Sequence, residues 1–292
     1  MRVALTNYGA KIEQILVPDR DGNFGDVALG YDSIAAVRTG QLSMGLFIGR
    51  YANRIAEGKF SLDGEAYQLA INSGRNSLHG GAKGSRFVVF DARQLDSSSV
   101  ALRYTFKDGE ENFPGNLATT ATYTVTAENA LVISWHAVAD RRTIANFTDH
   151  TFFNLAGHGR GDILGHVLTI NADRYTPVNT NLIPTGELAP VAGTPFDFRE
   201  PMPIGARIGD DHEQLKIGGS YDHDFVLNKP RRGEVTLAAR VMEPASGRVL
   251  ELWTTQPGMQ FFSGNNFDGN SPRDAGRGGT VYNYRGAFCI EA

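Results

Sequence analysis

Short stretches of alternating apolar and polar residues cover most of the chain and predict β-strands joined by tight turns. The clearest pair lies in residues 59–69, where an Asp63-Gly64 turn separates two alternating arms, a strong short-range signal for a β-hairpin. Three further pairs follow the same pattern: 87–95 with 100–107, 117–126 with 131–138, and 235–242 with 248–255. No 12-residue window keeps the apolar spacing of an amphipathic helix, so only short helical turns are expected, at 33–37 and 210–215.

Closely spaced strands with turn residues between them predict an all-β fold, either a sandwich or a barrel. No change in composition marks a boundary, so residues 1–292 are expected to form a single large antiparallel domain. Residues 175–207 are rich in Pro and Gly and alternate poorly, which predicts a long ordered loop of a kind that is often functional. A second Gly-rich loop, at 264–279, is expected at a rim.

Composition and charge narrow the class of protein. With 41% hydrophobic residues and a net charge of -4, the chain is expected to be soluble and globular, with ample material for a core. It offers no basic face for nucleic acid and no polybasic patch for a membrane. The single cysteine, Cys289, excludes an intrachain disulfide and a cysteine-rich zinc site. The N-terminal segment lacks the pattern of a signal peptide, so a cytoplasmic location is expected.

The segment Asn146-Phe-Thr-Asp-His-Thr-Phe-Phe-Asn-Leu-Ala-Gly157 places a histidine in a run typical of a strand. In an extended chain, one face of this run would look like a pocket wall, and it would carry Thr148, His150, Phe152 and Asn154. Phe147 and Phe153 would anchor the opposite face. An imidazole held this way could shuttle protons near neutral pH. The alternative is a core histidine satisfied by a neighbour.

Two more segments carry polar side chains that could meet a ligand. Residues 49–58 include Asn53 and Arg54, whose donors suit hydroxyls or an anion. The alternative there is a solvated edge on which Arg54 pairs with Glu57. Residues 76–81 form a Gly-rich loop with His79 at its tip, and the alternative is an exposed histidine without a role.

Three candidates lie near the C-terminal end. Asp222 precedes an apolar strand in an Asp-His-Asp triplet, which suggests a metal site, but alternation turns His223 away from the two carboxylates. No recognised metal-ligand spacing occurs elsewhere, so no metal is expected. Gln260 follows a Pro-Gly turn on another strand. Glu291 shares a face with Cys289, and spacing alone indicates a solvated chain end there.

Taken together, these segments resemble the aldose 1-epimerase (galactose mutarotase) family, in order over nearly the whole chain. The matching text includes IGRYANRIAEGKFSLDGEAYQLAINSGRNSLHGG, NFTDHTFFNLAGHG, GSYDHDFVL and GAFCIEA. The resemblance implies a large antiparallel β-sandwich of the galactose mutarotase-like type. His150 resembles the family's general acid, and Glu291 matches its general base. Residues at positions that match sugar contacts are Asn53, Arg54, His79, Asp222 and Gln260, and Phe152 stands where an aromatic residue, often tyrosine, lines the pocket.

The reaction that the resemblance implies interconverts the α and β anomers of a free hexose such as galactose or glucose, without a cofactor. Glu291 would take a proton from the C1 hydroxyl, and His150 would give one to the ring oxygen. Compared with the family, the chain is expected to be truncated at the C-terminus and possibly at the N-terminus.

Two other functions are compatible with the sequence. One is a sugar-binding protein of the same fold with impaired catalysis. The other is an epimerase of hexose 6-phosphates, in which Arg50 and Arg54 would hold the phosphate. A glycosidase would need two carboxylates flanking the scissile bond, which a His–Glu pair does not supply.

Overall fold

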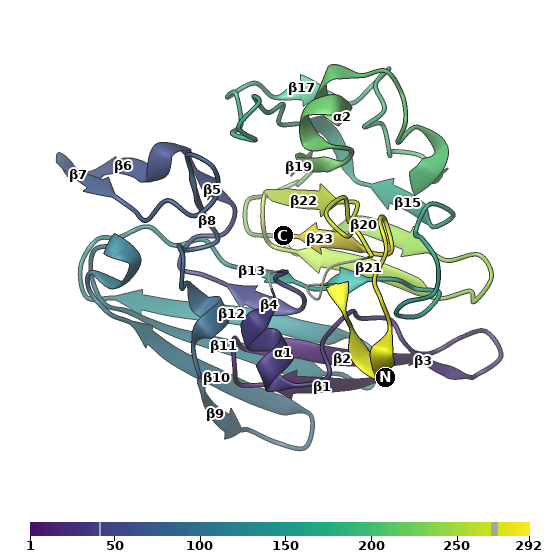
Figure 1. Cartoon of the computed structure of the whole chain (residues 1–292), viewed down its shortest axis with the longest axis horizontal. Coiled ribbons are helices and arrows are strands. Elements are labelled where there is room, and N and C mark those ends of the chain that lie inside the picture. Colours follow the sequence, from purple (N-terminus) through teal and green to yellow (C-terminus); the bar gives the residue numbers. More distant parts are fainter. Residues whose placement is uncertain (41, 270–273) are drawn as a thin grey trace. The chain divides into compact units, whose positions relative to one another are not determined.

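The computed structural model describes residues 1–40, 42–269 and 274–292 (Figure 1). Strands dominate this part of the chain, and the α-helices in it are short: α1 (Ile34–Thr39) and α2 (Glu213–Gly218). Both lie at or beside the predicted helical turns, and the prediction of an all-β fold built from antiparallel sheets is confirmed. None of the helices in these ranges is long and apolar enough to span a membrane. Part of the loop predicted at 264–279, namely residues 270–273, lies outside the described residues.

The chain divides into two compact units. The first comprises Met1–Glu13 and Gly45–Asp149, and the second comprises Gln14–Met44 and His150–Ala292. The expectation of one domain over residues 1–292 stays a prediction.

The first unit is built on a four-stranded antiparallel sheet with the order β12-β11-β10-β9. Its strands are β9 (Asp91–Gln94), β10 (Ser99–Phe106), β11 (Leu117–Val125) and β12 (Leu131–Ala139). The pairing confirms two of the predicted hairpins. The strand predicted from residue 87 begins only at Asp91, because η2 (Ser85–Phe87) closes a 3-10 turn just before it.

The predicted turn at Asp63-Gly64 joins β6 (Lys59–Leu62) to β7 (Glu65–Gln68). Both turn residues have positive φ, 54° and 85°, as the tightest hairpin turn requires. Another pairing in this unit joins β5 to β8. The remaining elements of the unit are β1 (Arg2–Thr6), β4 (Leu46–Ile48), β5 (Arg54–Ile55), β8 (Ser77–Leu78), β13 (Thr148–His150), η1 (Ala56–Gly58) and η3 (Glu110–Asn112). The last residue of β13 is the first of the second unit's longer segment.

The second unit contains a six-stranded sheet, ordered β14-β23-β22-β19-β16-β17, and a four-stranded sheet, ordered β18-β15-β20-β21. The first comprises β14 (Phe152–Phe153), β16 (Ala172–Tyr175), β17 (Ala189–Pro190), β19 (Asp222–Leu227), β22 (Gly258–Phe262) and β23 (Phe288–Glu291). The second comprises β15 (Val167–Ile170), β18 (Met202–Pro203), β20 (Thr236–Met242) and β21 (Val249–Thr254), and β20 with β21 confirms the last predicted hairpin. The unit also holds most of β2 (Lys11–Pro18), together with β3 (Phe24–Asp26), η4 (Ile204–Ala206) and η6 (Arg277–Gly279).

One face of the six-stranded sheet forms part of the aromatic core of this unit. Along β19 the side chains alternate, with His223, Phe225 and Leu227 buried and the intervening residues partly exposed. Phe196 stacks on Tyr175, with ring centroids 4.4 Å apart. Phe196 comes from the long segment predicted at 175–207, which has little regular structure yet contributes buried side chains. The sheet therefore has an apolar face and a second face of different chemistry.

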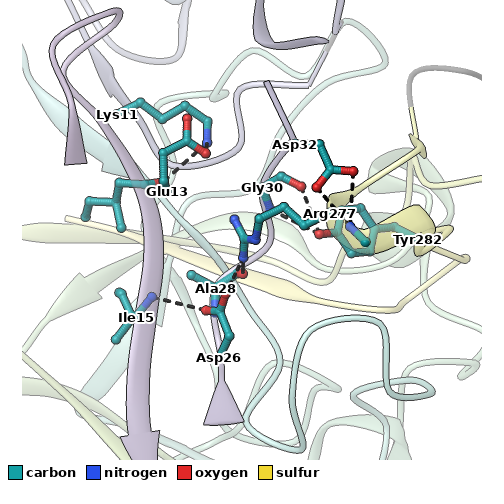
Figure 2. Close-up of polar contacts among 11 residues, drawn as sticks. Lys11, Glu13, Ile15, Asp26, Ala28, Gly30, Asp32, Arg277 and Tyr282 are labelled. Atoms are coloured by element: carbon teal, nitrogen blue, oxygen red, sulfur yellow. Dashed lines mark hydrogen bonds and ion pairs between the residues drawn. The ribbon is translucent and has the colours of Figure 1, made fainter. Parts of the chain in front are cut away.

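A hydrogen-bonded network holds residues 26–30 against residues 277–282 in the second unit (Figure 2). The buried carboxylate of Asp26 pairs with the guanidinium of Arg277, which also donates to the carbonyl oxygen of Ala28 at 2.7 Å. The hydroxyl of Tyr282 donates to the Gly30 carbonyl at 3.0 Å and accepts from the Gly30 amide at 3.1 Å. These contacts tie the loop after β3 to the segment that leads into β23.

Candidate active site

Strand register gathers several of the predicted residues on one face of the six-stranded sheet. Residues directly opposite each other in antiparallel strands point to the same side, as do residues two apart in one strand. Asp224 pairs with Gln260, which pairs with Glu291; Asp222 pairs with Phe262, which pairs with Cys289; and Cys289 pairs with Phe152. We call this side, with Phe152, Asp222, Asp224, Gln260, Phe262, Cys289 and Glu291, the polar face.

His150 and Glu291 meet at this face. The distance between His150 Nε2 and Glu291 Oε1 is 3.6 Å, and the two side chains are only 10% and 8% exposed. This is an ion-pair distance if the ring is protonated, and it is longer than a direct hydrogen bond. An imidazole and a carboxyl group, two groups that can exchange protons, therefore face each other across a short gap that is shielded from bulk water.

Glu291 is held here although it is the next-to-last residue. Strand β23 lies inside the sheet, with β14 on one side and β22 on the other. The reading from spacing alone, a solvated chain end, is therefore wrong. Strand β14 pairs with Phe288 and Cys289, and β22 pairs with the strand as far as Glu291, which keeps this residue in register with Gln260.

The ring of His150 packs against Phe152, with centroids 5.1 Å apart. Phe152 is 1% exposed and also contacts the rings of Phe262 and Phe267. Alternation correctly placed His150 beside Phe152, but it misplaced Asn154. The Asn154 side chain is fully buried and donates to the Gly286 carbonyl at 3.0 Å, so it supports the backbone instead of lining a pocket. The strand is interrupted at residue 151, between β13 and β14, and ends at 153, so the twofold period does not continue.

Asp222 and Gln260 are joined directly. The side-chain amide of Gln260 donates to Asp222 Oδ1 at 2.6 Å, and both side chains remain partly exposed. This bond fixes the orientation of the Gln260 amide. The amide oxygen of Gln260 and Oδ2 of Asp222 take no part in the bond and point in other directions. The pair can accept and donate hydrogen bonds, as the recognition of sugar hydroxyls requires.

His223 points away from the two carboxylates, as alternation predicted, and its side chain belongs to the core. It is fully buried; its Nδ1 accepts from the Asp222 amide at 3.2 Å, and its Nε2 lies 3.1 Å from Gln214 Oε1. Burial lowers the pKa of His223 to about 4, so the ring is neutral. The Asp-His-Asp triplet therefore does not direct its three side chains to one point. His166 has a similar structural role: its Nε2 accepts from the Leu155 amide at 3.0 Å, and burial lowers its pKa to about 4.

Asn53, Arg54 and His79 lie in the first unit, where they form a cluster of their own. The backbone amide of Asn53 donates to His79 Nδ1 at 3.2 Å, and the backbone amide of His79 donates to the backbone carbonyl of Asn53 at 3.0 Å. Because Nδ1 accepts this bond, the ring hydrogen of neutral His79 is on Nε2. Asn53 and His79 have φ values of 58° and 52°, a conformation that is uncommon for residues with a side chain and is concentrated at functional sites.

Arg54 and Arg50 do not make the contacts that the alternatives from sequence gave them, which were an ion pair with Glu57 for Arg54 and a phosphate for Arg50. Arg54 Nη1 donates to Asn53 Oδ1 at 3.3 Å, while Glu57 pairs with Lys59 and Arg75, so the proposed Arg54–Glu57 pair does not form. Arg50 is 2% exposed, donates to the Gly115 carbonyl and lies over the ring of Phe113. A phosphate could not reach the Arg50 guanidinium in this position, which removes one of the two predicted phosphate ligands.

Asp224 and Cys289 lie on the polar face, but no role was assigned to them from sequence. Asp224 lies beside Gln260 in register, and burial raises its pKa to about 6. Cys289 is fully buried, and its Sγ lies 3.3 Å from Nδ1 of His150. Alternation already put Asp224 with Asp222 and Cys289 with Glu291, so their positions were predictable. Their partners on other strands were not.

Comparison with known proteins gives a consistent result. The family model described as aldose 1-epimerase matches residues 1–292. Galactose mutarotase of Sus scrofa is 43% identical over 291 residues, which is 100% of this chain and 82% of the relative. Aldose 1-epimerase of Escherichia coli (strain K12) is 37% identical over 93% of this chain and 78% of the relative.

Solved structures agree with these relatives. A galactose 1-epimerase from Lactobacillus acidophilus matches with a TM-score of 0.85 and 32% identity, over 99% of this chain and 81% of that one. An aldose epimerase homologue from C. elegans matches with a TM-score of 0.89 and 29% identity, over 99% of this chain and 85% of that one. The resemblance and the predicted fold type are therefore confirmed, and the chain belongs to the aldose 1-epimerase family.

Proposed function

We propose that the protein is a mutarotase that interconverts the α and β anomers of a free hexose, galactose or glucose, with His150 as acid and Glu291 as base. The observation that carries this proposal is the 3.6 Å approach of His150 Nε2 to Glu291 Oε1 in a shielded position. The ring oxygen and the C1 hydroxyl of a sugar are bonded to the same carbon. An acid and a base separated by a short gap can therefore reach both oxygens at once.

The proposed reaction needs two proton transfers in each direction. The Glu291 carboxylate removes the proton of the C1 hydroxyl while the protonated His150 ring gives its Nε2 proton to the ring oxygen, which breaks the C1–ring oxygen bond. Rotation about the C1–C2 bond presents the other face of the carbonyl. When the ring closes, the hydroxyl formed from the ring oxygen returns its proton to His150 Nε2, and Glu291 returns its proton to the C1 oxygen. The protein therefore ends unchanged.

The remaining predicted residues would orient the sugar. Asp222 and Gln260, joined by their 2.6 Å hydrogen bond, offer acceptors and donors beside the base. Phe152 supplies an apolar surface next to the acid. Roles in sugar contact for Asn53, Arg54 and His79 come from the resemblance and stay predictions. Their substitution by alanine should raise KM, and for His79 and Arg54 should also lower kcat if they stabilise charge on the sugar.

Polarimetry of freshly dissolved α-D-galactose and α-D-glucose tests the proposal. The protein should accelerate the approach to equilibrium rotation, and His150→Gln and Glu291→Gln should each lower the rate by ~10²–10⁴-fold. Exposed residues of the same types provide controls, because His136→Gln and Glu251→Gln should leave the rate unchanged. The rate should also depend on pH, so a constant rate from about pH 5 to 9 would contradict an acid–base pair.

The same experiment separates the other candidate functions. Binding of galactose or glucose without acceleration would favour a sugar-binding protein of this fold. Acceleration restricted to a hexose 6-phosphate would favour the phosphorylated substrate, against which the buried position of Arg50 argues. We also propose a cytoplasmic location on the grounds of the sequence alone, which fractionation of the producing cells would test.

A further inference from the structure

Cys289 approaches His150 at a different ring nitrogen from the one that approaches Glu291. Its Sγ lies 3.3 Å from His150 Nδ1, whereas the other ring nitrogen, Nε2, lies 3.6 Å from Glu291 Oε1. The residues are 139 positions apart in sequence and meet through the pairing of β14 with β23. The thiol is fully buried, so the contact is not a chance approach of two mobile surface side chains.

The backbone leaves the thiol little freedom. Cys289 is paired with Phe152 on one side and with Phe262 on the other, in the interior of the six-stranded sheet. The ring of Phe152 also packs on the His150 ring, at 5.1 Å between centroids. The imidazole is therefore confined by an aromatic ring and approached by the sulfur at one particular nitrogen.

That contact decides which ring nitrogen faces the base. A half-turn of the ring about its bond to Cβ would exchange nitrogen and carbon positions and would present a C–H group to Glu291. In the observed orientation Nδ1 meets the sulfur, so Nε2 is the nitrogen left for proton exchange. Hydrogen bonding at one nitrogen of a histidine sets the state of the other.

A thiol suits this task in both protonation states of the ring. When the ring is protonated, Nδ1–H can donate to the sulfur. After Nε2 has given its proton to the sugar, the hydrogen that stays on Nδ1 can still donate to the sulfur, and Nε2 then has the lone pair that takes the proton back. A carboxylate at this place would strongly favour the protonated ring. Because sulfur is a weak acceptor, it orients the ring without strongly biasing its proton affinity.

We propose that Cys289 is a positioning residue, whose thiol keeps His150 turned so that Nε2 exchanges the proton during ring opening and closure. This inference rests on the proposed role of His150 as the acid. It adds to that role a residue that does not touch the sugar. Cys289 acts through the ring orientation, so its loss should slow catalysis while leaving sugar binding nearly unchanged.

Three variants test the inference. Cys289→Ala removes the contact, Cys289→Ser restores a group that can both donate and accept, and Ile290→Val trims a buried side chain of the same strand on the other face of the sheet. We expect Cys289→Ala to lower kcat about 10-fold with KM changed less than about twofold, and Cys289→Ser to recover most of this loss. Ile290→Val should keep wild-type kcat, and thermal melts will show that all three variants are folded.

A spectroscopic measurement gives a readout that a structural role alone would not change. In ¹⁵N-histidine-labelled protein, in buffer alkaline enough for the ring to be neutral, His150 should show one dominant tautomer, with hydrogen on Nδ1. Cys289→Ala should move the two ring-nitrogen shifts toward an average, and Cys289→Ser should restore them. If Cys289→Ala does not fold, the serine variant and its spectrum still decide.

Several outcomes would overturn the inference. They are wild-type kcat in Cys289→Ala, an equal loss in Ile290→Val, no recovery in a folded Cys289→Ser, or an unchanged tautomer in both cysteine variants. Failure of the proposed function looks different, because the wild-type protein itself would then not accelerate mutarotation.

Discussion

Replacing Asp224 by asparagine is expected to stabilise the second unit at neutral pH and to have no effect in acid. Asp224 lies on the polar face of β19, in register with Gln260. Burial raises its pKa from the ordinary 3.8 to about 6, and a hydrogen bond from the Met259 backbone offsets only part of this effect. The carboxylate is thus more costly to ionise in the folded protein than in the unfolded chain.

The sign of the effect follows from proton binding. Below about pH 3.8 both states hold the proton, and between 3.8 and about 6 the folded state holds it while the unfolded chain releases it. The contribution of Asp224 to the free energy of unfolding therefore falls as the pH rises through this window and is constant, at its lowered value, above about 6. The two values differ by about two pKa units, and at 1.36 kcal/mol for each unit the cost is about 3 kcal/mol.

Urea unfolding followed by circular dichroism, at a series of pH values from about 4 to 8, measures this cost as a difference between variant and wild type. Taking the difference cancels the other titrating groups. The free energy of unfolding of Asp224→Asn, relative to wild type, should rise with pH up to about pH 6 and then stay constant. Asp21→Asn, at an exposed aspartate of the same unit, is the matched control. A difference that does not change with pH would refute the reasoning, and so would an advantage largest in acid.

Three further substitutions probe the second unit. Asp26→Asn removes the negative charge that pairs with the Arg277 guanidinium, whose side chain is only 12% exposed, and should lower the free energy of unfolding in urea by about 3–5 kcal/mol; a loss below 1 kcal/mol would contradict a tight pair. Tyr221→Phe removes a 3.1 Å hydrogen bond to the Pro195 carbonyl and should cost about 1–2 kcal/mol in the same assay, whereas no loss would mean that the bond contributes nothing. Because burial lowers the pKa of both His223 and His166 to about 4, the contribution of each to stability is lost as the pH falls from 6.5 to about 4. His223→Gln should make this acid limb less steep, and an equally steep limb would exclude His223 as one of its sources.

Features that depend on neighbouring residues were predictable from the sequence. The Asp63-Gly64 turn determines its hairpin locally, because both turn residues must adopt positive φ. Alternation likewise put Asp222 and Asp224 on one face and His223 on the other. The same rule failed at Asn154, where the break between β13 and β14 ends the twofold period within a few residues.

Features that depend on the order of strands could not be predicted from local pattern. Which strand pairs with β23 is decided by sheet topology, and no spacing within residues 288–291 contains that information. The proximity of His150 to Glu291, and of Cys289 to His150, therefore needed either the structure or a family resemblance. The resemblance points to His150 as the acid and Glu291 as the base, which stay predictions, and it gives no role to the thiol of Cys289.

The sheet order also explains why the proposed base and its neighbours behave as one unit. Residues near the end of a chain usually fray, because few contacts hold their backbone. Strand β23 instead lies between β14 and β22, so each residue of Phe288–Glu291 is held from at least one side, and Cys289 from both. The pairing with β14 brings the sulfur to His150, and the pairing with β22 brings Glu291 to Gln260. Slipping β23 by one residue would turn Cys289 and Glu291 to the apolar face together. The proposed orientation of His150 and the position of the proposed base thus depend on the same register, and a mutation that shifts this register should abolish both at once.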